Sequence, residues 1–322
     1  MNQSLRILLL FFCGGPVAQA AWHTDVQDKM GTRMEVQIWH EDAEQATVLL
    51  ADAMAEFDRI EALMSTYRET SEISRVNRDA ASQPVPVTIE LYSLVELSLA
   101  MGELTGGAFD ITYDSVGQLY DYRERQRPGD EEIDARLEAI DYRFVTLDPA
   151  ARAIGFRQEG VRINLGGIAK GYAVESVISM LRAAGVEHAL ATAGGDTRLL
   201  GDRREKPWIV GVRDPDDESG VVTRLGLIDE AVSTSGDYER FFVEEGVRYH
   251  HILDPGTGQS ASGVRSATVV GPDATMTDGL STSVFVLGAE KGIELIERLE
   301  GYEAIVVDTE RGVRFSTGLD PR

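Results

Sequence analysis

The sequence has 322 residues, of which 43% are hydrophobic and 26% charged, and its formal net charge at pH 7 is -23. This length and composition suit a globular protein with a large core, in one bilobed domain or two small ones. The negative charge is spread along the chain and disfavours binding to nucleic acid, because phosphate contacts need a basic surface. A protein of this charge that handles a polyanionic ligand must gather its few cations or recruit a metal ion.

Residues 1–20 are typical of a cleavable secretory signal. A polar start with one cation, Arg6, precedes the apolar run Ile7–Phe12, and Ala18-Gln19-Ala20 forms a small-x-small cleavage site. We therefore expect an exported, periplasmic protein whose mature part, residues 21–322, is a single functional domain. The apolar run is shorter than the ~20 residues that span a membrane, so we expect peripheral membrane contact or none.

Cys13 is the single cysteine of the sequence and lies inside the signal. A lipid-acceptor site needs a small residue immediately before the cysteine, and Phe12 stands there. We therefore favour the cleaved form over a lipid-anchored one. Because cleavage would remove Cys13, disulfides and thiol catalysis are not expected in the mature protein.

The first half of the chain is predicted to be mainly helical. Arg33–Trp39 alternates like a strand, and apolar residues recur at helical spacing over Ala43–Leu63 and again over Ile89–Leu104. Two glycines end the second helix and open a loop that runs to about Asp114. A charged stretch after this loop leads into a short predicted helix, Glu131–Ile140.

The second half is predicted to be richer in strands. We expect strands near Phe144–Leu147, Ala153–Phe156, Arg162–Leu165, Ala189–Leu200, Trp208–Arg213, Arg224–Asp229, Glu239–Val243, Ala267–Val270, Glu303–Asp308 and Gly312–Ser316. Helices are expected at Ile168–Ala184, Thr277–Leu287 and Ala289–Leu299. Together these elements predict an α+β sandwich with mixed sheets and flanking helices, in two lobes.

A glycine-rich turn with a lysine joins one predicted strand to the strong helix that follows. Its sequence is Asn164-Leu165-Gly166-Gly167-Ile168-Ala169-Lys170-Gly171. Glycines let the backbone approach a ligand, and a helix start presents free N–H groups to a phosphate. The spacing matches neither a Walker motif nor GxGxxG, so a plain tight connection with a surface lysine explains it equally well.

Asp278 and Thr282 lie four residues apart on one face of a predicted helix. A carboxylate and a hydroxyl suit a hard cation such as Mg²⁺, which takes one or two protein carboxylates and otherwise water and phosphate oxygens. In isolation, the simpler explanation is that Asp278 complements the positive end of its own helix.

His250 and His251 are adjacent in a strand-like stretch, so one faces each side. The inward one could act as a base or a ligand, although such pairs are more often structural. Asp254, shortly after them, is most simply part of a turn. In the loop before Asp114, Phe109 and Asp110 could contact the ring system of a ligand, but by itself Phe109 is more simply a core residue.

Taken together and in this order, these stretches resemble the FAD:protein FMN transferase family, also called ApbE. Further stretches in the same order strengthen the resemblance over nearly the whole mature chain: Met30-Gly31-Thr32, Met64-Ser65-Thr66-Tyr67 and Ser71–Asn77. Two positions depart from the family pattern. Asn164 stands where aspartate is usual, and Ala193 stands where asparagine is common.

The resemblance implies roles for individual residues around a flavin cleft between the two lobes. It implies FAD contacts by Met30, Tyr67, Ala108, Phe109, Asp110, Asn164, Lys170 and the backbone near Ile252. It implies Mg²⁺ bound by Asp278, Thr282 and the carbonyl of Gly167. We expect His251 to accept a proton and Asp254 or Asp237 to orient it, and strand register decides which histidine faces the site.

The chemistry implied is transfer of FMN from FAD to a threonine or serine hydroxyl of an acceptor protein, with AMP leaving. Such a reaction needs positioning and positive charge, which Mg²⁺, Lys170 and the helix start would supply. The family resemblance suggests exported redox-pump subunits as acceptors. Two alternatives stay open from sequence: an FAD pyrophosphatase that releases FMN and AMP, and an exported flavin-binding protein without catalysis.

Overall fold

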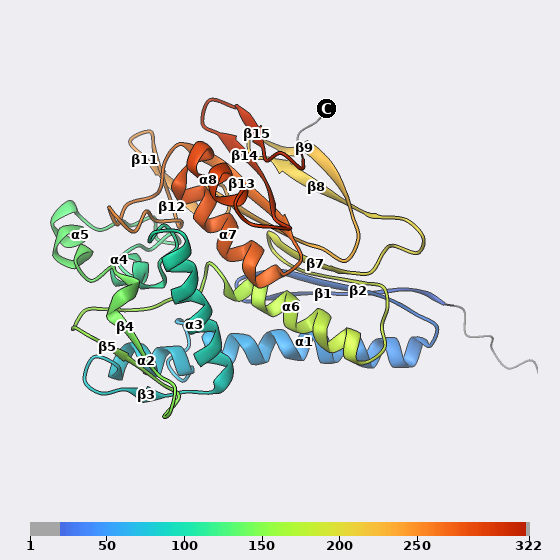
Figure 1. The fold of residues 1–322 in the computed structure, drawn as a ribbon, viewed down its shortest axis with the longest axis horizontal. Coiled ribbons are helices and arrows are strands. Elements are labelled where there is room, and N and C mark those ends of the chain that lie inside the picture. Colours follow the sequence, from blue (N-terminus) through green and yellow to red (C-terminus); the bar gives the residue numbers. More distant parts are fainter. Residues whose placement is uncertain (1–19, 320–322) are drawn as a thin grey trace, which may run out of the picture.

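An eight-stranded sheet forms the centre of the molecule in the computed structural model, which describes residues 20–319 (Figure 1). The strands lie in the order β1 (Ala21–Lys29), β2 (Thr32–His40), β6 (Ala189–Ala193), β7 (Asp196–Leu200), β10 (Ala231–Gly236), β13 (Val264–Gly271), β14 (Glu303–Asp308) and β15 (Val313–Phe315). Every strand pair in this sheet is antiparallel, where mixed sheets were expected. The α+β class itself is confirmed.

Helices cover one face of the sheet, and a long hairpin covers the other. The helices are α1 (Ala43–Met64), α6 (Ala169–Ala183), α7 (Ala274–Leu287) and α8 (Ala289–Ile296). The hairpin is formed by β8 (Trp208–Asp214) and β9 (Asp217–Leu227). Alternation along β13 shows the two faces, because Val269 belongs to the core cluster under the helices and Val270 to the cluster under the hairpin. The predicted sandwich is therefore present as helices, sheet and hairpin.

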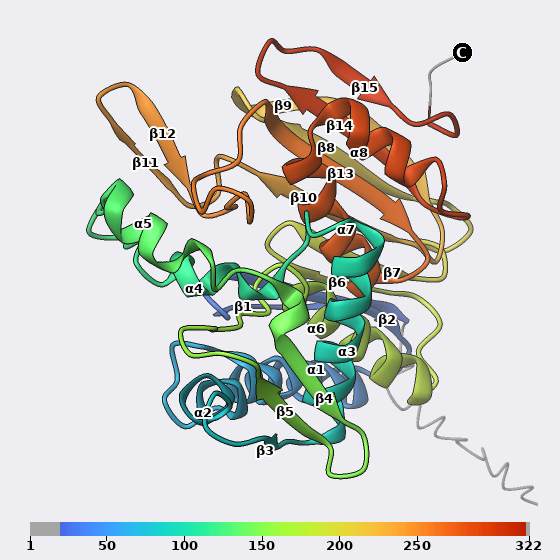
Figure 2. The ribbon, with the colours of Figure 1, turned by 60° about the vertical axis from the view of Figure 1, so that its left-hand side comes forward.

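A second lobe is inserted between α1 and α6 and lies beside the ends of these helices (Figure 2). Its elements are α2 (Glu72–Asp79), α3 (Ile89–Leu104), the short sheet β3 (Val85–Pro86)–β5 (Ala153–Phe156)–β4 (Val145–Asp148), two 3-10 turns η1 (Ile111–Tyr113) and η2 (Tyr142–Phe144), α4 (Asp114–Gly117) and α5 (Asp130–Leu137). One large core cluster runs through both lobes, so they pack as one body. None of the described helices is both long and apolar enough to cross a membrane.

A two-stranded arm, β11 (Phe241–Glu244) and β12 (Val247–His250), projects from the body next to α5 (Figure 2). The ring of Phe242 packs near Tyr122 and Tyr249 at its base. The predicted strand Glu239–Val243 overlaps β11, and the strand-like stretch that contains His250 overlaps β12, although His251 lies just beyond the end of that strand. The arm contacts the second lobe through Tyr122, and its second strand ends at His250, immediately before His251 of the predicted site.

Three expectations about elements were wrong in detail. Residues 162–165 are not a strand, because Ile163 N donates to the side-chain oxygen of Asn77 instead of a neighbouring strand. Residues 189–200 are two strands joined by a tight turn at Gly194, whose φ of 62° is in the left-handed region. Helix α7 begins at Ala274, with Asp273 as its N-cap, three residues before the predicted start.

Candidate functional site

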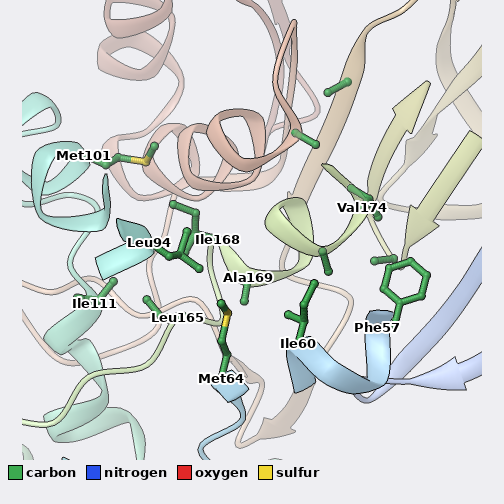
Figure 3. Close-up of a cluster of buried hydrophobic side chains, with 14 of the residues drawn as sticks. Phe57, Ile60, Met64, Leu94, Met101, Ile111, Leu165, Ile168, Ala169 and Val174 are labelled. Carbon is green, nitrogen blue, oxygen red and sulfur yellow. The ribbon is translucent and has the colours of Figure 1, made fainter. Parts of the chain in front are cut away.

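Two buried apolar side chains anchor the glycine turn in the main core. Leu165 and Ile168 are fully buried and belong to the core that Met64 of α1 and Leu94 of α3 also enter (Figure 3). The turn between these two anchors therefore has little freedom. A Cβ atom at Gly167 would lie 3.3 Å from the Oγ1 atom of Thr282, so the turn backbone directly faces that residue of α7.

Asp278 meets the start of α6 from the neighbouring helix. Its carboxylate accepts a hydrogen bond of 2.8 Å from Gly171 N, in the first turn of α6, and only 2% of the residue is exposed. The sequence suggested that Asp278 complements the positive end of its own helix, but α7 starts at Ala274, so Asp278 lies in the second turn of α7 and at the N-terminus of α6 instead. Asp278, Thr282 and the glycine turn are thus brought together as predicted.

Lys170 lies between two buried carboxylates. Its Nζ atom donates a hydrogen bond to Asp196, which is 1% exposed, and lies 3.8 Å from Oδ1 of Asp278. Burial alone would lower the pKa of Lys170, but these two carboxylates raise it above its usual value. Burial and the Asp196 carboxylate raise the pKa of Asp278. The lysine charge is therefore largely balanced by the protein itself.

Hydroxyl groups attach α7 to strand β10. Ser235 Oγ lies 2.9 Å from Ser281 Oγ and 3.2 Å from Thr282 Oγ1, and Ser233 Oγ lies 2.9 Å from Thr277 Oγ1. Ser233 and Ser235 are two positions apart on β10, so both point to the helix side of the sheet. These contacts fix where the Thr282 hydroxyl lies relative to the glycine turn.

The two histidines have different surroundings. His250 is 3% exposed, its Nε2 atom lies 2.9 Å from the Ala261 carbonyl oxygen, and its Nδ1 atom accepts a 3.3 Å hydrogen bond from Ile252 N. It is a structural residue. His251 is half-buried, and its buried Nδ1 atom has no hydrogen-bond partner among the described residues. Burial, then the positive charges of Arg240 and Lys170, lower the pKa of His251 to about 3.

Neither carboxylate expected to orient His251 does so in the described residues. Asp254 Oδ1 accepts a 2.8 Å hydrogen bond from Gly256 N within its own turn. Asp237 pairs with two arginines instead, at 3.3 Å from Arg248 and 2.9 Å from Arg265. Both carboxylates are engaged locally, so the expected orienting contact is absent among the described residues.

The predicted flavin contacts in the loop after α3 are mostly engaged within the protein. Phe109 is 3% exposed and belongs to the main core, which agrees with the simpler explanation for it. Asp110 caps the 3-10 turn η1, with hydrogen bonds from Thr112 N and Tyr142 N, both 2.8 Å. Ala108 is half-buried. Phe109 forms part of the wall behind Gly167, where a Cβ would lie 3.3 Å from its ring.

The remaining predicted flavin contacts differ in exposure. Tyr67 is 88% exposed just after α1, and Met30, with φ of 49°, is at the tight turn between β1 and β2. Ile252 is buried, and its carbonyl oxygen accepts a hydrogen bond from Ala261 N. The structure alone assigns no flavin role to these residues, and their roles stay predictions.

Asn164 is held by an acidic neighbour that the sequence analysis did not identify. Its Oδ1 atom accepts a 2.9 Å hydrogen bond from Gly166 N, and its Nδ2 atom donates to Asp114 Oδ1 at 3.1 Å. Asp114 is also bonded to Arg162 Nε at 2.5 Å and is 5% exposed. Asn164 therefore fixes the shape of the glycine turn, with Asp114 behind it.

Sequence reasoning missed several residues of this site because they come from distant segments. Asp196, Ser235 and Arg240 lie in stretches rich in Gly, Ser and Asp, which carry no alternation of polarity that would mark them as site residues. Within residues 20–319, no group of three or more His, Cys, Asp or Glu side chains is arranged to hold a metal ion. A metal at this site would need hydroxyl, carbonyl or ligand oxygens beside the carboxylate of Asp278.

Comparison with known proteins gives consistent matches over nearly the whole chain. The model of the ApbE family matches residues 30–306. The FAD:protein FMN transferase of Treponema pallidum is 31% identical, covering 99% of this chain and 94% of that protein. The enzyme of the same name from Vibrio cholerae is 33% identical over 78% of this chain and 77% of its own length.

Solved structures agree with the sequence matches. The crystal structure of the ApbE protein from Thermotoga maritima superposes with a TM-score of 0.87 at 33% identity and covers 92% of this chain and 98% of that one. The flavin transferase ApbE from Vibrio cholerae superposes with a TM-score of 0.82 at 28% identity and covers 92% and 96%.

Proposed function

This chain belongs to the ApbE family, and we propose that it transfers the FMN half of FAD to a hydroxyl group of an acceptor protein. The observation that carries the proposal is the meeting of Asp278 and Thr282 with the glycine turn beside Lys170. This meeting joins the glycine turn before α6 and the distant helix α7 into one polar site, of a kind that can bind a dinucleotide diphosphate.

We propose Mg²⁺ as the metal of this site. The donors present are a buried carboxylate, a threonine hydroxyl and the carbonyl of Gly167, which are hard oxygen ligands of the type that Mg²⁺ prefers. Gly167 supports the fit, because a Cβ there would lie 3.3 Å from the Thr282 hydroxyl. When bound, the ion would supply positive charge to the diphosphate of FAD.

In the proposed reaction, a threonine or serine oxygen of the acceptor attacks the phosphorus on the FMN side of FAD. A new P–O bond to the acceptor forms, the P–O bond to AMP breaks, and AMP leaves with the electron pair. His251 accepts the hydroxyl proton, and its low pKa keeps the free enzyme's imidazole neutral at physiological pH. We expect the bound diphosphate, being negative, to raise that pKa and make His251 a better base.

The test is a transfer assay with the mature protein, FAD, Mg²⁺ and candidate exported acceptors, read by the mass of the acceptor. Covalently attached FMN supports the proposal. Free FMN and AMP without labelled acceptor would show a pyrophosphatase instead, and intact FAD would show a binding protein.

Asp278→Asn is the sharpest variant for the metal. The amide can still accept the hydrogen bond from Gly171 N, but it lacks the charge that a cation needs. We expect a loss of about 100-fold or more in Mg²⁺-dependent cleavage with little change in thermal stability. Asp148→Asn is the control, because the exposed Asp148 in the second lobe likewise accepts a backbone hydrogen bond, from Ala150 N at 2.9 Å, and should retain activity.

We also propose that the protein works outside the cytoplasm, on exported acceptors such as redox-pump subunits. The support is the signal-like sequence of residues 1–20, and residues 1–19, which include Cys13, lie outside the described part of the chain. The mass of the protein purified from a periplasmic extract tests this. A mature chain that begins at Ala21 is expected, and an intact Met1 would contradict it.

A further inference from the structure

We infer that Arg240 is a ligand-binding residue of this site and contacts the diphosphate of FAD. The inference rests on the proposed function, because it names the residue that binds one part of that substrate. It starts from the position of Arg240 at the base of the β11–β12 arm, where its carbonyl oxygen accepts a 3.1 Å hydrogen bond from His251 N. The backbones of Arg240 and His251 are thus paired.

The guanidinium of Arg240 reaches toward the turn between β1 and β2. Its Nη2 atom lies 3.4 Å from the carbonyl oxygen of Gly31, and a Cβ at Gly31 would lie only 2.9 Å from the same atom. Gly31 follows Met30, one of the predicted flavin contacts. Arg240 therefore spans the space between this turn and His251, at the edge of the site.

Arg240 differs from the other arginines around the arm in lacking an acidic partner. Arg248 and Arg265 both pair with Asp237, and Arg127 pairs with Glu244. Among the described residues, no carboxylate lies within 4.0 Å of the Arg240 guanidinium, which is exposed. In a protein of net charge -23, an exposed guanidinium at the edge of the site is available for an anionic ligand.

The charge balance of the site requires one more cation when a metal ion and FAD are bound. Lys170 is paired with Asp196 and lies near Asp278, so this cluster carries one negative charge when both carboxylates are ionised. A divalent cation would turn that into one positive charge, whereas a diphosphate diester brings two negative ones. One more cation is needed for neutrality, and Arg240 lies within electrostatic reach of both Lys170 and His251.

An arginine suits this place for geometric reasons as well. Its planar guanidinium can donate two parallel hydrogen bonds to one phosphate, whereas a lysine donates from a single point. In the transfer reaction, charge increases on the phosphate oxygens as AMP leaves. Arg240 therefore binds FAD in the ground state and can strengthen that contact in the transition state.

The experiment compares the affinities of FAD, FMN and riboflavin for the wild-type protein and for Arg240→Gln, measured by flavin fluorescence with EDTA to prevent cleavage. Riboflavin carries no phosphate and reports the ring contacts alone. We expect Arg240→Gln to weaken FAD about tenfold or more and to leave riboflavin unchanged. Loss with FAD alone would place Arg240 on the AMP-side phosphate, and loss with FMN also would place it on the FMN side.

Arg248→Gln is the matched control, because it removes another arginine from the same arm that already has a carboxylate partner. Arg240→Lys should recover part of the FAD affinity. Equal weakening of riboflavin and FAD, unchanged FAD affinity in Arg240→Gln, or the same FAD loss in Arg248→Gln would each overturn the inference. The affinities are measured at equilibrium and without an acceptor protein. Their outcome therefore tests the role of Arg240 independently of whether the protein transfers FMN.

Discussion

Asn164 shows how one residue adapts a family site to its neighbours. The family resemblance implied aspartate at this position, but here the amide donates to Asp114, which lies behind it and accepts a hydrogen bond from Arg162. Burial raises the pKa of Asp114, although Arg162 opposes that effect. The amide thus links the glycine turn to a buried carboxylate without adding a second negative charge.

We predict that Asn164→Asp, which introduces the residue that the family resemblance implied, destabilises this protein by about 1–3 kcal/mol. Two carboxylate oxygens would face each other at the position of a present 3.1 Å hydrogen bond, and one group would have to take up a proton. Urea unfolding at pH 7 and pH 5 measures the effect, which should shrink at the lower pH. The double variant Asn164→Asp with Asp114→Asn should recover part of the stability. A stabilised Asn164→Asp protein would contradict this explanation.

His250 predicts a pH dependence of stability. Burial lowers its pKa below the usual 6.5, and the neutral ring accepts from Ile252 N at Nδ1, a bond that protonation there would break. The pKa of His250 is therefore lower in the folded protein than in the unfolded one. The stability that the neutral ring contributes is fully present above about pH 6.5, and it is lost as the pH falls toward the pKa of the folded protein.

We therefore expect the unfolding free energy of the wild-type protein to fall more steeply between pH 7 and pH 5 than that of His250→Gln. The difference in slope should approach about 1.4 kcal/mol per pH unit at most. Denaturant titrations across this range measure it. Parallel curves for the two proteins would show that His250 does not titrate as the structure implies.

At the scale of elements, the site depends on how closely α6 and α7 cross. Gly171 makes the crossing possible, because a Cβ there would lie 2.1 Å from the Ala274 carbonyl oxygen and 2.6 Å from the Asp278 Cβ. Both distances are shorter than van der Waals contact, and one of them is to a backbone atom. The helices would have to separate, and Asp278 would move with α7.

We predict that Gly171→Ala costs about 3 kcal/mol of stability and most of the metal-dependent activity, even though alanine favours helices. Thermal unfolding and the FAD cleavage assay measure the two effects. Gly129→Ala is the control, since its Cβ would meet its nearest neighbour at 3.7 Å and its φ is -71°. A Gly171→Ala protein as stable as this control would mean that the helices can shift without loss.

Long helices and the buried strands at the end of the chain were predictable because each carries its pattern locally. Helix α3 has the predicted bounds, as does β14, and Thr88 caps α3 through Leu91 N. Strand β10 was missed because its residues, Ala231–Gly236, are small and hydroxylated and do not alternate in polarity. Their partners are the hydroxyls of α7, more than forty residues away, and no local pattern reveals such a partner.

The site was predictable to the extent that its residues sit in recognisable motifs. Asp278, Thr282 and Gly167 meet as expected. The pairing of Lys170 with Asp196 could not be read from sequence, because it depends on the β6–β7 turn being placed beside α6 by the sheet. The same holds for Arg240, which the arm carries toward Gly31.

The strongly acidic protein has to bind an anionic substrate in the proposed reaction. The net charge of -23 repels FAD at a distance, whereas Arg240 and a bound cation attract it only at short range. Salt separates the two effects, because the screening length falls from ~30 Å at 0.01 M to ~8 Å at 0.15 M. At the higher salt the long-range repulsion is screened while close contacts are retained.

We predict that the association rate constant of FAD, measured by stopped-flow flavin fluorescence with saturating Mg²⁺, rises by about twofold or more between these two salt concentrations. Riboflavin, which is uncharged, should associate at the same rate in both and serves as the control. Arg240→Gln should show a steeper rise than the wild-type protein, because it lacks the cation that opposes repulsion at the edge of the site. If salt slowed FAD association instead, the local field of the site would dominate the net charge, and attraction would reach further than the contacts of Arg240 imply.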